Sequence, residues 1–313
     1  MTKTDQPLHV AVTGGAGFIG SHLADAFLDR GDRVTVIDDL SGGKRENVSP
    51  RAELLELDIR SREAAEAVAD LEVQVLVHHA AQMDVGRSVK DPCFDADVNI
   101  VGSLNLIEAG RRAALQQVLF ASTGGAMYGE QEVYPAPEDH PTRPVSPYGV
   151  SKLALERYLY FYHQEYSLDA TCLRYANVYG ERQNPHGEAG VVAIFLNRLL
   201  AGETPRINGD GGQTRDYIHV SDVVRANLSA LGRPGFHIYN IGTGRETSVL
   251  GLYDGLRRAA ESEIRAEHGP PRPGEQRRSS IDGSVARREL ALPDPLDLEA
   301  GLGRTAGWFR DRT

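Results

Sequence analysis

The chain has 313 residues, of which 41% are hydrophobic and 25% are charged. This composition lies near the average for globular proteins. It excludes a disordered chain, which has too little apolar surface to offset the entropy lost on folding. Thirty-four Lys and Arg residues against 44 Asp and Glu residues give a formal net charge of −10. Because nucleic-acid binding depends largely on clustered Lys and Arg, the acidic balance argues against a nucleic-acid partner. A local basic pocket for a small anion is still compatible with this charge.

The length favours one large domain with a smaller lobe, because a single core rarely grows to this size. No apolar run reaches the roughly 18 residues that span a bilayer, and the N-terminal stretch contains no apolar signal region. The two cysteines, Cys93 and Cys172, show neither a disulfide framework nor the CxxC spacing of a zinc site. We therefore expect a protein of the reduced cytoplasm, with no membrane contact and no metal.

Short apolar runs alternate with stretches of helical spacing along most of the chain. The runs predict buried strands at residues 8–13, 33–38, 53–57, 73–78, 117–122, 170–176 and 237–241. The stretches between them predict helices at residues 18–30, 61–69, 101–112 and 151–163. This alternation indicates an α/β fold with a Rossmann-type, doubly wound parallel sheet. The carboxyl ends of its strands share one edge, where ligands bind.

The pattern loosens after about Tyr179, where segments rich in Gly, Pro and charge indicate a smaller C-terminal substrate-binding lobe. The strand candidate near Ile238 returns to the sheet, so the two parts are not divided by a single cut. We expect the sheet domain to comprise residues 1–178 with a returning segment at about 216–245. The lobe then comprises residues 179–215 and 246–313.

A glycine-rich turn follows the first predicted strand and opens the first helix. Gly14, Gly17 and Gly20 have the spacing GxxGxxG, one residue different from the GxGxxG dinucleotide fingerprint. Glycines let the turn approach a pyrophosphate, and the helix that continues through Phe18 and Ile19 offers free N–H groups at its positive end. This pattern predicts a dinucleotide site in the sheet domain.

Two carboxylates at the end of the second predicted strand indicate which dinucleotide is bound. Asp38 lies 24 residues beyond Gly14, close to the spacing expected of an acid that binds the adenosine ribose. Asp38 and Asp39 together would repel a 2′-phosphate, so NAD is favoured over NADP.

Two further strand ends offer contacts to this cofactor. Asp58 and Ile59 either flank the adenine or form a plain helix cap ahead of Ser61, and the sequence does not separate these alternatives. Ala80 and Ala81 are small enough to admit the pyrophosphate and ribose. They follow a pair of histidines, which we interpret as a packed strand end rather than a metal site, because no third ligand has suitable spacing nearby.

Tyr148 and Lys152 form a YxxxK motif, which places a phenol and an ammonium on one face of a helix. The lysine is expected to stabilise the phenolate and lower the phenol pKa, as a base working near neutral pH requires. The partner hydroxyl should come from the end of the 117–122 strand. Thr123 is the first choice, because Ser122 points the opposite way if the strand continues. The alternative is that both hydroxyls only satisfy backbone groups.

Taken together, these motifs resemble the extended short-chain dehydrogenase/reductase family, and within it the nucleotide-sugar epimerases that are similar to UDP-glucose 4-epimerase. The matching segments are TGGAGFIGSHL (13–23), DVNIVGSLNLIEA (97–109), FASTGGAMYGE (120–130), SPYGVSK (146–152), LRYANVYGERQNPHGEAGVVAIF (173–195), NGDGGQTRDYIHVSDVV (208–224), YNIGTG (239–244) and RPGEQRRS (272–279). The resemblance implies that NAD stays bound through turnover and that Tyr148 is the base. It also implies that Lys152 binds the nicotinamide ribose and that Asn99 and Tyr175 contact the cofactor.

The same resemblance implies a set of substrate contacts. Arg215 and Arg272 match the arginines that clamp the diphosphate, for which guanidinium geometry is suited. The other implied contacts to the sugar, the diphosphate and the nucleotide are Asn177, Val192, Ile207, Tyr217 and Glu275. Without the family, Arg215 could be a surface ion pair with Asp216, and Arg272 could belong to a solvated basic loop.

The residues after Thr123 indicate which reaction follows the first oxidation at C4 of the sugar. In the related 4,6-dehydratases these residues are Asp and Glu, whereas here they are Gly124 and Gly125, which cannot transfer protons. The resemblance therefore favours 4-epimerisation of UDP-glucose and UDP-galactose. Ser279 matches a gate residue beside the sugar, and its small side chain predicts some activity on UDP-N-acetyl sugars.

Several alternatives stay open. The substrate could be a dTDP-sugar rather than a UDP-sugar, and the enzyme could be a uronate epimerase or decarboxylase or a 4,6-dehydratase. A non-catalytic NAD-binding regulator is a remote alternative, since such a protein would not need the Tyr148 and Lys152 pair. The family favours a homodimer built from the helices at 101–112 and 151–166, although their apolar residues could instead pack only on the sheet.

Overall fold

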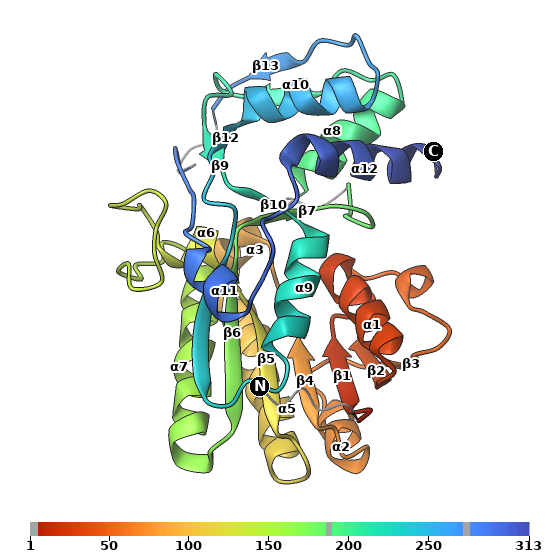
Figure 1. Ribbon diagram of the computed structural model, residues 1–313, viewed down its shortest axis with the longest axis vertical. Helices are drawn as coiled ribbons and strands as arrows, with labels where there is room; N and C mark the ends of the chain where they lie inside the picture. The colour runs from red at the N-terminus through yellow and green to blue at the C-terminus, as the bar shows by residue number, and fades with distance from the viewer. Residues whose placement is uncertain (1–5, 186–189, 272–275, 313) are drawn as a thin grey trace.

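The sheet is built from seven parallel strands, as the computed structural model shows for the residues that it describes, 6–185, 190–271 and 276–312 (Figure 1). Their order is β11-β6-β5-β4-β1-β2-β3, with the crossover between β1 and β4 that is typical of a doubly wound sheet. The strands are β1 (His9–Thr13), β2 (Arg33–Asp38), β3 (Glu53–Glu56), β4 (Val75–His78), β5 (Gln117–Thr123), β6 (Asp169–Tyr175) and β11 (Phe236–Ile241). The predicted fold class is confirmed.

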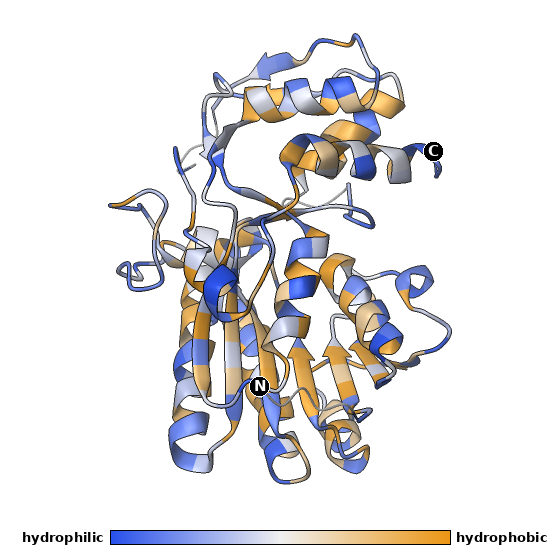
Figure 2. Ribbon diagram, in the orientation of Figure 1, coloured by the Kyte–Doolittle hydropathy of each residue, from blue (hydrophilic) through white to orange (hydrophobic). Residues whose placement is uncertain are grey.

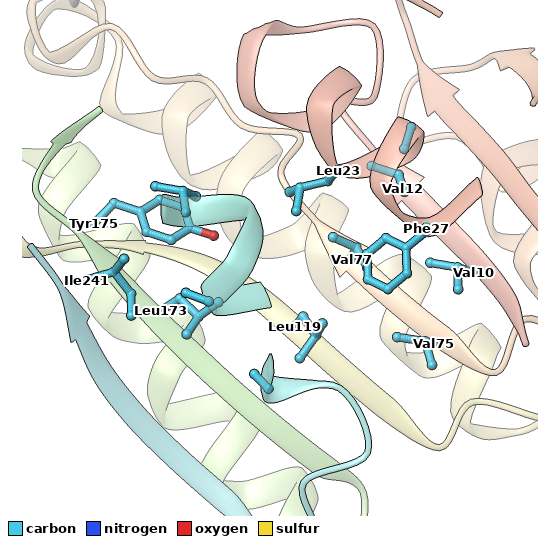
Figure 3. Close-up of a cluster of buried hydrophobic side chains, with 14 of the residues drawn as sticks. Val10, Val12, Leu23, Phe27, Val75, Val77, Leu119, Leu173, Tyr175 and Ile241 are labelled. Atoms are coloured by element: carbon cyan, nitrogen blue, oxygen red, sulfur yellow. The ribbon is translucent and has the colours of Figure 1, made fainter. Parts of the chain in front are cut away.

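Helices cover both faces of the sheet. One face carries α1 (Phe18–Arg30), α9 (Val220–Ala230) and α11 (Ser284–Glu289), and the other carries α2 (Arg62–Asp70), α5 (Ser103–Arg111) and α7 (Pro147–Tyr166). Each face has its own apolar core. Phe27 of α1 packs among strand valines such as Val10 and Val77 in the first core, as Figure 3 shows. The central strands accordingly consist mainly of hydrophobic residues, as Figure 2 shows.

The smaller lobe lies beyond the carboxyl edge of the sheet (Figure 1). Its three helices are α8 (Val191–Leu200), α10 (Val249–Ala259) and α12 (Leu298–Arg310), which enclose a third apolar core. Three two-stranded ladders complete it and link it to the sheet domain. They pair β7 (Asn177–Tyr179) with β10 (Tyr217–His219), β8 (Arg206–Asn208) with β13 (Glu267–Gly269), and β9 (Thr214–Arg215) with β12 (Thr247–Ser248).

Short helical segments at the carboxyl edge connect the sheet to the site. A 3-10 turn, η1 (Arg45–Asn47), follows β2, while α3 (Val85–Lys90) and α4 (Pro92–Ala96) follow β4. A π-helical stretch, η2 (Asp97–Gly102), joins α4 to α5, and α6 (Gly124–Met127) follows β5. None of the helices in the described part of the chain is both long and apolar enough to cross a membrane.

The structure differs from the sequence prediction at the start of α7. The helix was expected from residue 151, but it begins at Pro147, so Tyr148 lies in its first turn. The hydroxyl of Ser146 accepts a hydrogen bond from the Gly149 amide at 3.2 Å and caps the helix. Ser followed by Pro is a typical start signal, because Pro lacks the N–H that would be left unpaired there.

Candidate active site

The glycine turn after β1 fits a pyrophosphate. Gly14 has a φ of +67°, and a Cβ atom there would lie 2.7 Å from the Ala80 amide nitrogen at the end of β4. A Cβ on Gly20 would overlap the Gly14 carbonyl. Gly17 precedes α1 and provides no side-chain cap, so the first N–H groups and the positive end of the helix are available to an anion. Phe18 and Ile19 form the start of that helix.

Asp38 connects the end of β2 to the glycine turn. Its two carboxylate oxygens accept hydrogen bonds at 2.9 Å from the amides of Ala16 and Leu40. Burial raises the pKa of this carboxyl group, and the two backbone bonds oppose that rise. Asp39 is largely turned to solvent, where it accepts hydrogen bonds from the amide and hydroxyl of Ser41. Asp38 is therefore the carboxylate that lies against the cofactor turn.

Asp58 does not cap the helix that follows it. The cap of α2 is Ser61, whose hydroxyl accepts from the Ala64 amide at 3.1 Å, so the plain-cap alternative for Asp58 is wrong. Asp58 instead pairs with Arg60 at 2.6 Å, and this hydrogen-bonded pairing lowers the pKa of its carboxyl group. Ile59 is buried beside Gly102, the last residue of η2.

The histidine pair at the end of β4 is packed and hydrogen-bonded. The Thr13 hydroxyl accepts from the amides of His79 and Ala80 and lies 2.8 Å from Nδ1 of His78. Nε2 of His78 lies 2.7 Å from the hydroxyl of Ser103. Burial lowers the pKa of both imidazoles to about 3, so both rings are neutral at physiological pH. Ala80 and the half-buried Ala81 follow them at the ligand edge.

Lys152 is anchored to the end of β5. Its ammonium donates to the Ala121 carbonyl at 2.9 Å and lies 4.8 Å from the centre of the Phe120 ring. It also lies 5.8 Å from the centre of the Tyr148 ring, which confirms that the two side chains share one face of α7. Burial lowers the pKa of Lys152 to about 8, against the opposing charge of Asp95.

The pKa of Tyr148 differs from the sequence prediction. We expected the lysine to lower it, but burial and then the negative charge of Asp95 raise it well above the usual value. The physical reason is that burying the phenolate costs more free energy than its attraction to the ammonium of Lys152, which is anchored at Ala121, recovers. The chain by itself therefore keeps Tyr148 protonated.

The two candidate hydroxyls at the end of β5 point to different partners. Ser122 is buried, and its hydroxyl donates to a carboxylate oxygen of Glu156 on α7 at 2.6 Å. Thr123 is half-buried and caps α6, because its hydroxyl accepts from the Ala126 amide at 3.3 Å. The Thr123 hydroxyl keeps its own proton for another partner. The next residues, Gly124 and Gly125, lie against Ile281 and Ser279.

Asp95 is a site residue that the sequence analysis missed. Its Oδ1 accepts hydrogen bonds from Gln82 at 3.0 Å and from Asn99 at 3.1 Å, while its buried Oδ2 has no partner in the described ranges. Asn99 also accepts from the Gln82 amide at 2.8 Å, so it holds the loop after β4. Tyr175, another predicted cofactor contact, is buried, and its hydroxyl is hydrogen-bonded to Asn227 and His79. No motif in the sequence singles out Asp95.

The predicted substrate residues that the structure describes lie in the lobe core or near the carboxyl edge of the sheet. Val192, Ile207 and Tyr217 are buried in the lobe core, and Asn177 begins β7. Ser279 is buried beside Gly125. Arg272 and Glu275 lie outside the described residues.

The structure decides one alternative for Arg215. The carboxylate of Asp216 accepts hydrogen bonds from the amide and hydroxyl of Thr243 and from the Gly244 amide. Arg215 donates instead to the Thr214 carbonyl at 2.7 Å. Across residues 6–185, 190–271 and 276–312 the Arg215–Asp216 ion pair does not form, so that alternative is wrong.

Comparison with known proteins shows to which family this chain belongs. The model of the NAD dependent epimerase/dehydratase family matches residues 10–242, a span that runs from β1 to the end of β11. The chain belongs to this family. The expected resemblance to the extended short-chain dehydrogenases and to UDP-glucose 4-epimerases is confirmed.

Relatives in the family match over nearly their whole length. The chain is 44% identical to a UDP-glucose 4-epimerase of Mycolicibacterium smegmatis, covering 98% of this chain and 100% of the relative. It is similar to the crystal structure of a UDP-glucose 4-epimerase with UDP-glucose from Thermotoga maritima, with a TM-score of 0.95, 45% identity and coverage of 97% and 99%. A UDP-glucose 4-epimerase complex with NAD from Thermus thermophilus has a TM-score of 0.93, 42% identity and coverage of 98% and 100%.

The buried Lys152 predicts a pH dependence of stability. Because its pKa is lowered to about 8 in the folded chain from an unfolded value of 10.5, the unfolded chain binds more protons between these values. The contribution of Lys152 to the free energy of unfolding is therefore lowest below pH 8 and rises toward pH 10.5. Replacing Lys152 by Met removes this dependence. Urea denaturation of both proteins, freed of nucleotide, should show an advantage of K152M that shrinks from pH 7 to pH 10. A constant difference would contradict the burial argument.

Proposed function

We propose that this chain is an NAD-dependent isomerase that interconverts UDP-glucose and UDP-galactose by epimerisation at C4. The observation that carries the proposal is the placement of Tyr148 and Lys152 on one face of α7, with the lysine anchored to the strand end that leads to Thr123. The names of full-length relatives support the same activity. The cofactor is NAD rather than NADP, since the negative charges of Asp38 and Asp39 would repel the 2′-phosphate of NADP.

Each residue of the proposed site has a separate task. When bound, the nicotinamide would accept the hydride from C4 of the sugar and return the same hydride to the opposite face of the rotated 4-keto sugar, and its oxidised form would place a positive charge near the phenol. Tyr148 takes the proton of the 4-hydroxyl, and Thr123 hydrogen-bonds the same hydroxyl and orients it. Lys152, fixed by the Ala121 carbonyl, binds the nicotinamide ribose and stabilises the phenolate. Because burial keeps Tyr148 protonated in the chain alone, we expect it to act as a base only beside an added positive charge.

Thr123 rather than Ser122 is the hydroxyl that we assign to the substrate. The Ser122 hydroxyl donates its proton to Glu156, which lies below the site on α7. The Thr123 hydroxyl uses one lone pair to cap α6 and keeps its proton. A substrate hydroxyl therefore finds a donor at Thr123 and none at Ser122.

The glycine pair supports epimerisation over dehydration. Elimination of water across C5 and C6 needs an acid and a base, and Gly124 and Gly125 carry neither. The side chains that lie against these two glycines are those of Ile281 and Ser279, which are also unsuited to act as the acid or the base of an elimination. A purified protein that gave a 4-keto-6-deoxy sugar and no C4 epimer would overturn the assignment.

Replacing Tyr148 by Phe tests the proposed base. The variant should bind NAD and UDP-galactose but turn over at least ~10²-fold more slowly, because it lacks the group that moves the proton. Release of NAD on denaturation and conversion of UDP-galactose, followed by the anomeric NMR signal, are the measurements. T123V should also lose turnover and should lose more than S122A. If Y148F kept the activity of the wild type, Tyr148 would not be the base. If the wild type converted no member of a panel of UDP- and dTDP-sugars, the proposed function would be wrong.

The substrate lobe is proposed to hold the nucleotide diphosphate. We assign Arg215 and Arg272 to the diphosphate, Asn177 to the sugar side, and Tyr217 and Glu275 to the nucleotide. In this assignment residues 1–178 with about 216–245 form the NAD-binding domain, and residues 179–215 and 246–313 form the lobe, except that α11 packs on the sheet. Asn177 and Tyr217 contribute to the nucleotide-sugar site from the edge of the NAD-binding domain. The nucleotide is uridine, with thymidine as the second choice.

Ser279 is proposed to admit an N-acetyl group beside the sugar. It is buried next to Gly125, two residues after Thr123, so it lines the same wall as the assigned hydroxyl. S279Y should abolish epimerisation of UDP-N-acetylglucosamine while UDP-glucose is still converted. Initial rates on the two sugars measure this directly, with S284Y, a change at a half-buried serine of α11, as the control. Equal losses on both sugars would contradict the gate.

We propose that the protein is a homodimer of the cytoplasm. On α7 the side chains of Leu155, Leu159 and Tyr162 pack on the sheet, whereas Tyr158 and Phe161 are 42% and 48% exposed. The helix thus has apolar side chains on a second face, which a second copy of the chain would cover.

Replacing Phe161 by Glu should separate the two subunits, because a charge in an apolar interface is costly to desolvate. Sedimentation velocity should give a dimer for the wild type and a monomer for F161E. The control is V133E, since Val133 is 56% exposed but lies outside the α5 and α7 helices. A wild-type monomer at all concentrations would exclude the dimer.

A further inference from the structure

A buried ion pair lies directly below the proposed site. Glu156 is on α7, one turn after Lys152 and two turns after Tyr148, and Arg174 is on the neighbouring strand β6. The side chains are 1% and 2% exposed. The guanidinium binds the carboxylate through two parallel hydrogen bonds, with Nε to Oε1 at 2.9 Å and Nη2 to Oε2 at 2.7 Å. This is the most constrained geometry that an Arg–Glu pair adopts.

The pair is connected to both ends of the turn that carries Thr123. On one side the hydroxyl of Ser122, the residue before Thr123, donates to the same Glu156 carboxylate at 2.6 Å. On the other side Nη1 of Arg174 donates to the hydroxyl of Tyr128, directly after α6, at 2.9 Å. A single ion pair therefore holds Ser122, immediately before the Thr123–Tyr128 turn, and Tyr128, the last residue of that turn.

The network extends to a third strand. The Tyr128 hydroxyl donates a hydrogen bond to the side-chain carbonyl of Asn240 on β11 at 2.7 Å. Asn240 in turn donates to the Ala136 carbonyl at 3.0 Å. Tyr128 and Asn240 are fully buried. Four structural elements, α7, β5, β6 and β11, thus meet at this cluster.

Stability alone does not account for this arrangement. Desolvating a carboxylate and a guanidinium offsets most of their attraction, so apolar side chains of similar volume generally stabilise a fold as well or better. What apolar side chains cannot supply is direction, since hydrogen bonds fix distances and angles while apolar contacts do not. A positional role therefore explains the pair better than a stabilising one.

We propose that Glu156 and Arg174 are positioning residues, which set the Thr123 turn against the Tyr148 and Lys152 face of α7. The helix contributes Tyr148, Lys152 and Glu156 at intervals of four residues, so the link from Glu156 to Ser122 fixes how far α7 stands from the end of β5. The inference rests on the proposed epimerase function, in which Thr123 and Tyr148 bind one substrate hydroxyl. Neither Glu156 nor Arg174 needs to contact the substrate.

The test compares three variants of the full-length protein with bound NAD. E156Q leaves the Arg174 charge unpaired and is expected to lower both stability and turnover. E156L/R174M removes both charges at similar volume and leaves only the Ser122 hydroxyl without its acceptor, so its melting temperature should fall less than that of E156Q. E289Q is the control, because Glu289 pairs with Arg233 and accepts from Tyr239 in a more exposed group, whose bonds within the described part of the chain do not reach the Thr123 turn.

The double variant separates position from stability. We expect its kcat to fall roughly 10²-fold, the loss that a displacement of about 1 Å in a reacting group produces, with the KM for UDP-galactose and the NAD content close to the wild-type values. Hydrogen exchange at the amides of residues 124–127 should be faster than in the wild type and unchanged in E289Q. A folded double variant with wild-type kcat and wild-type exchange would overturn the inference.

The outcome stays distinct from that of the proposed function. If the wild type converts no nucleotide sugar, the proposed function fails, and the hydrogen exchange of residues 124–127 in the double variant still decides whether the pair holds the turn. If the wild type is active and the double variant is equally active, only the positioning role fails.

Discussion

The parallel register of the sheet is the constraint on which the candidate site depends. Thr13 of β1 pairs with His78 of β4, and Thr123 of β5 pairs with Tyr175 of β6. Because His78 pairs with Phe120, β5 and β6 extend three residues (120 to 123) beyond the ends of β1 and β4. Because every strand runs in one direction, their C-terminal residues meet along one edge. The glycine turn can approach Ala80 only because β1 and β4 are neighbours in this register. A slip of one residue in any strand would turn its inner side chains to the opposite face.

The electrostatics of the edge follow from burial. The imidazoles of His78 and His79 are neutral, the phenol of Tyr148 is protonated, and the pKa of Lys152 is lowered to about 8. The chain therefore presents few charges where the cofactor and sugar would lie. Charge brought in by a ligand consequently acts strongly there, since low dielectric surroundings screen it little. Lys152 and Asp95 are exceptions. A pKa of about 8 leaves Lys152 mostly protonated at pH 7. The charge of Asp95, whose buried Oδ2 has no hydrogen-bond partner among the residues that the structure describes, opposes ionisation of the phenol.

The sequence is sufficient to predict those features of the fold and the site that depend on local patterns of residues. The valine-rich strands, the glycine turn and the YxxxK spacing are local signals, and the structure places each of them where the pattern predicts. Features that depend on contacts between distant residues were not accessible. Glu156 looks like an ordinary helix residue, and only the fold brings Ser122 and Arg174 to it. The same holds for Asp95, and for the two- and three-residue strands of the lobe, which are too short to show a period.

The pKa of Tyr148 illustrates a second limit. The motif correctly places a lysine beside the phenol, but a motif carries no information on how deeply both groups are buried. Here desolvation outweighs the attraction, so the direction of the shift is reversed. The sequence also did not decide whether Asp58 caps α2. The structure decides it, because the hydroxyl of Ser61 accepts the hydrogen bond that caps this helix.

The third apolar core joins pieces of chain that are far apart in sequence. It combines Val192 and Leu196 of α8 with Leu252 of α10 and with Leu302 and Phe309 of α12. On the ribosome, α8 and α10 emerge well before α12, so their apolar faces remain uncovered until α12 has been synthesised. The sheet domain takes most of its members from earlier segments, but its last helix, α11, is synthesised only after α10. The apolar face between α8 and α10 is therefore completed only when α12, near the end of the chain, has emerged.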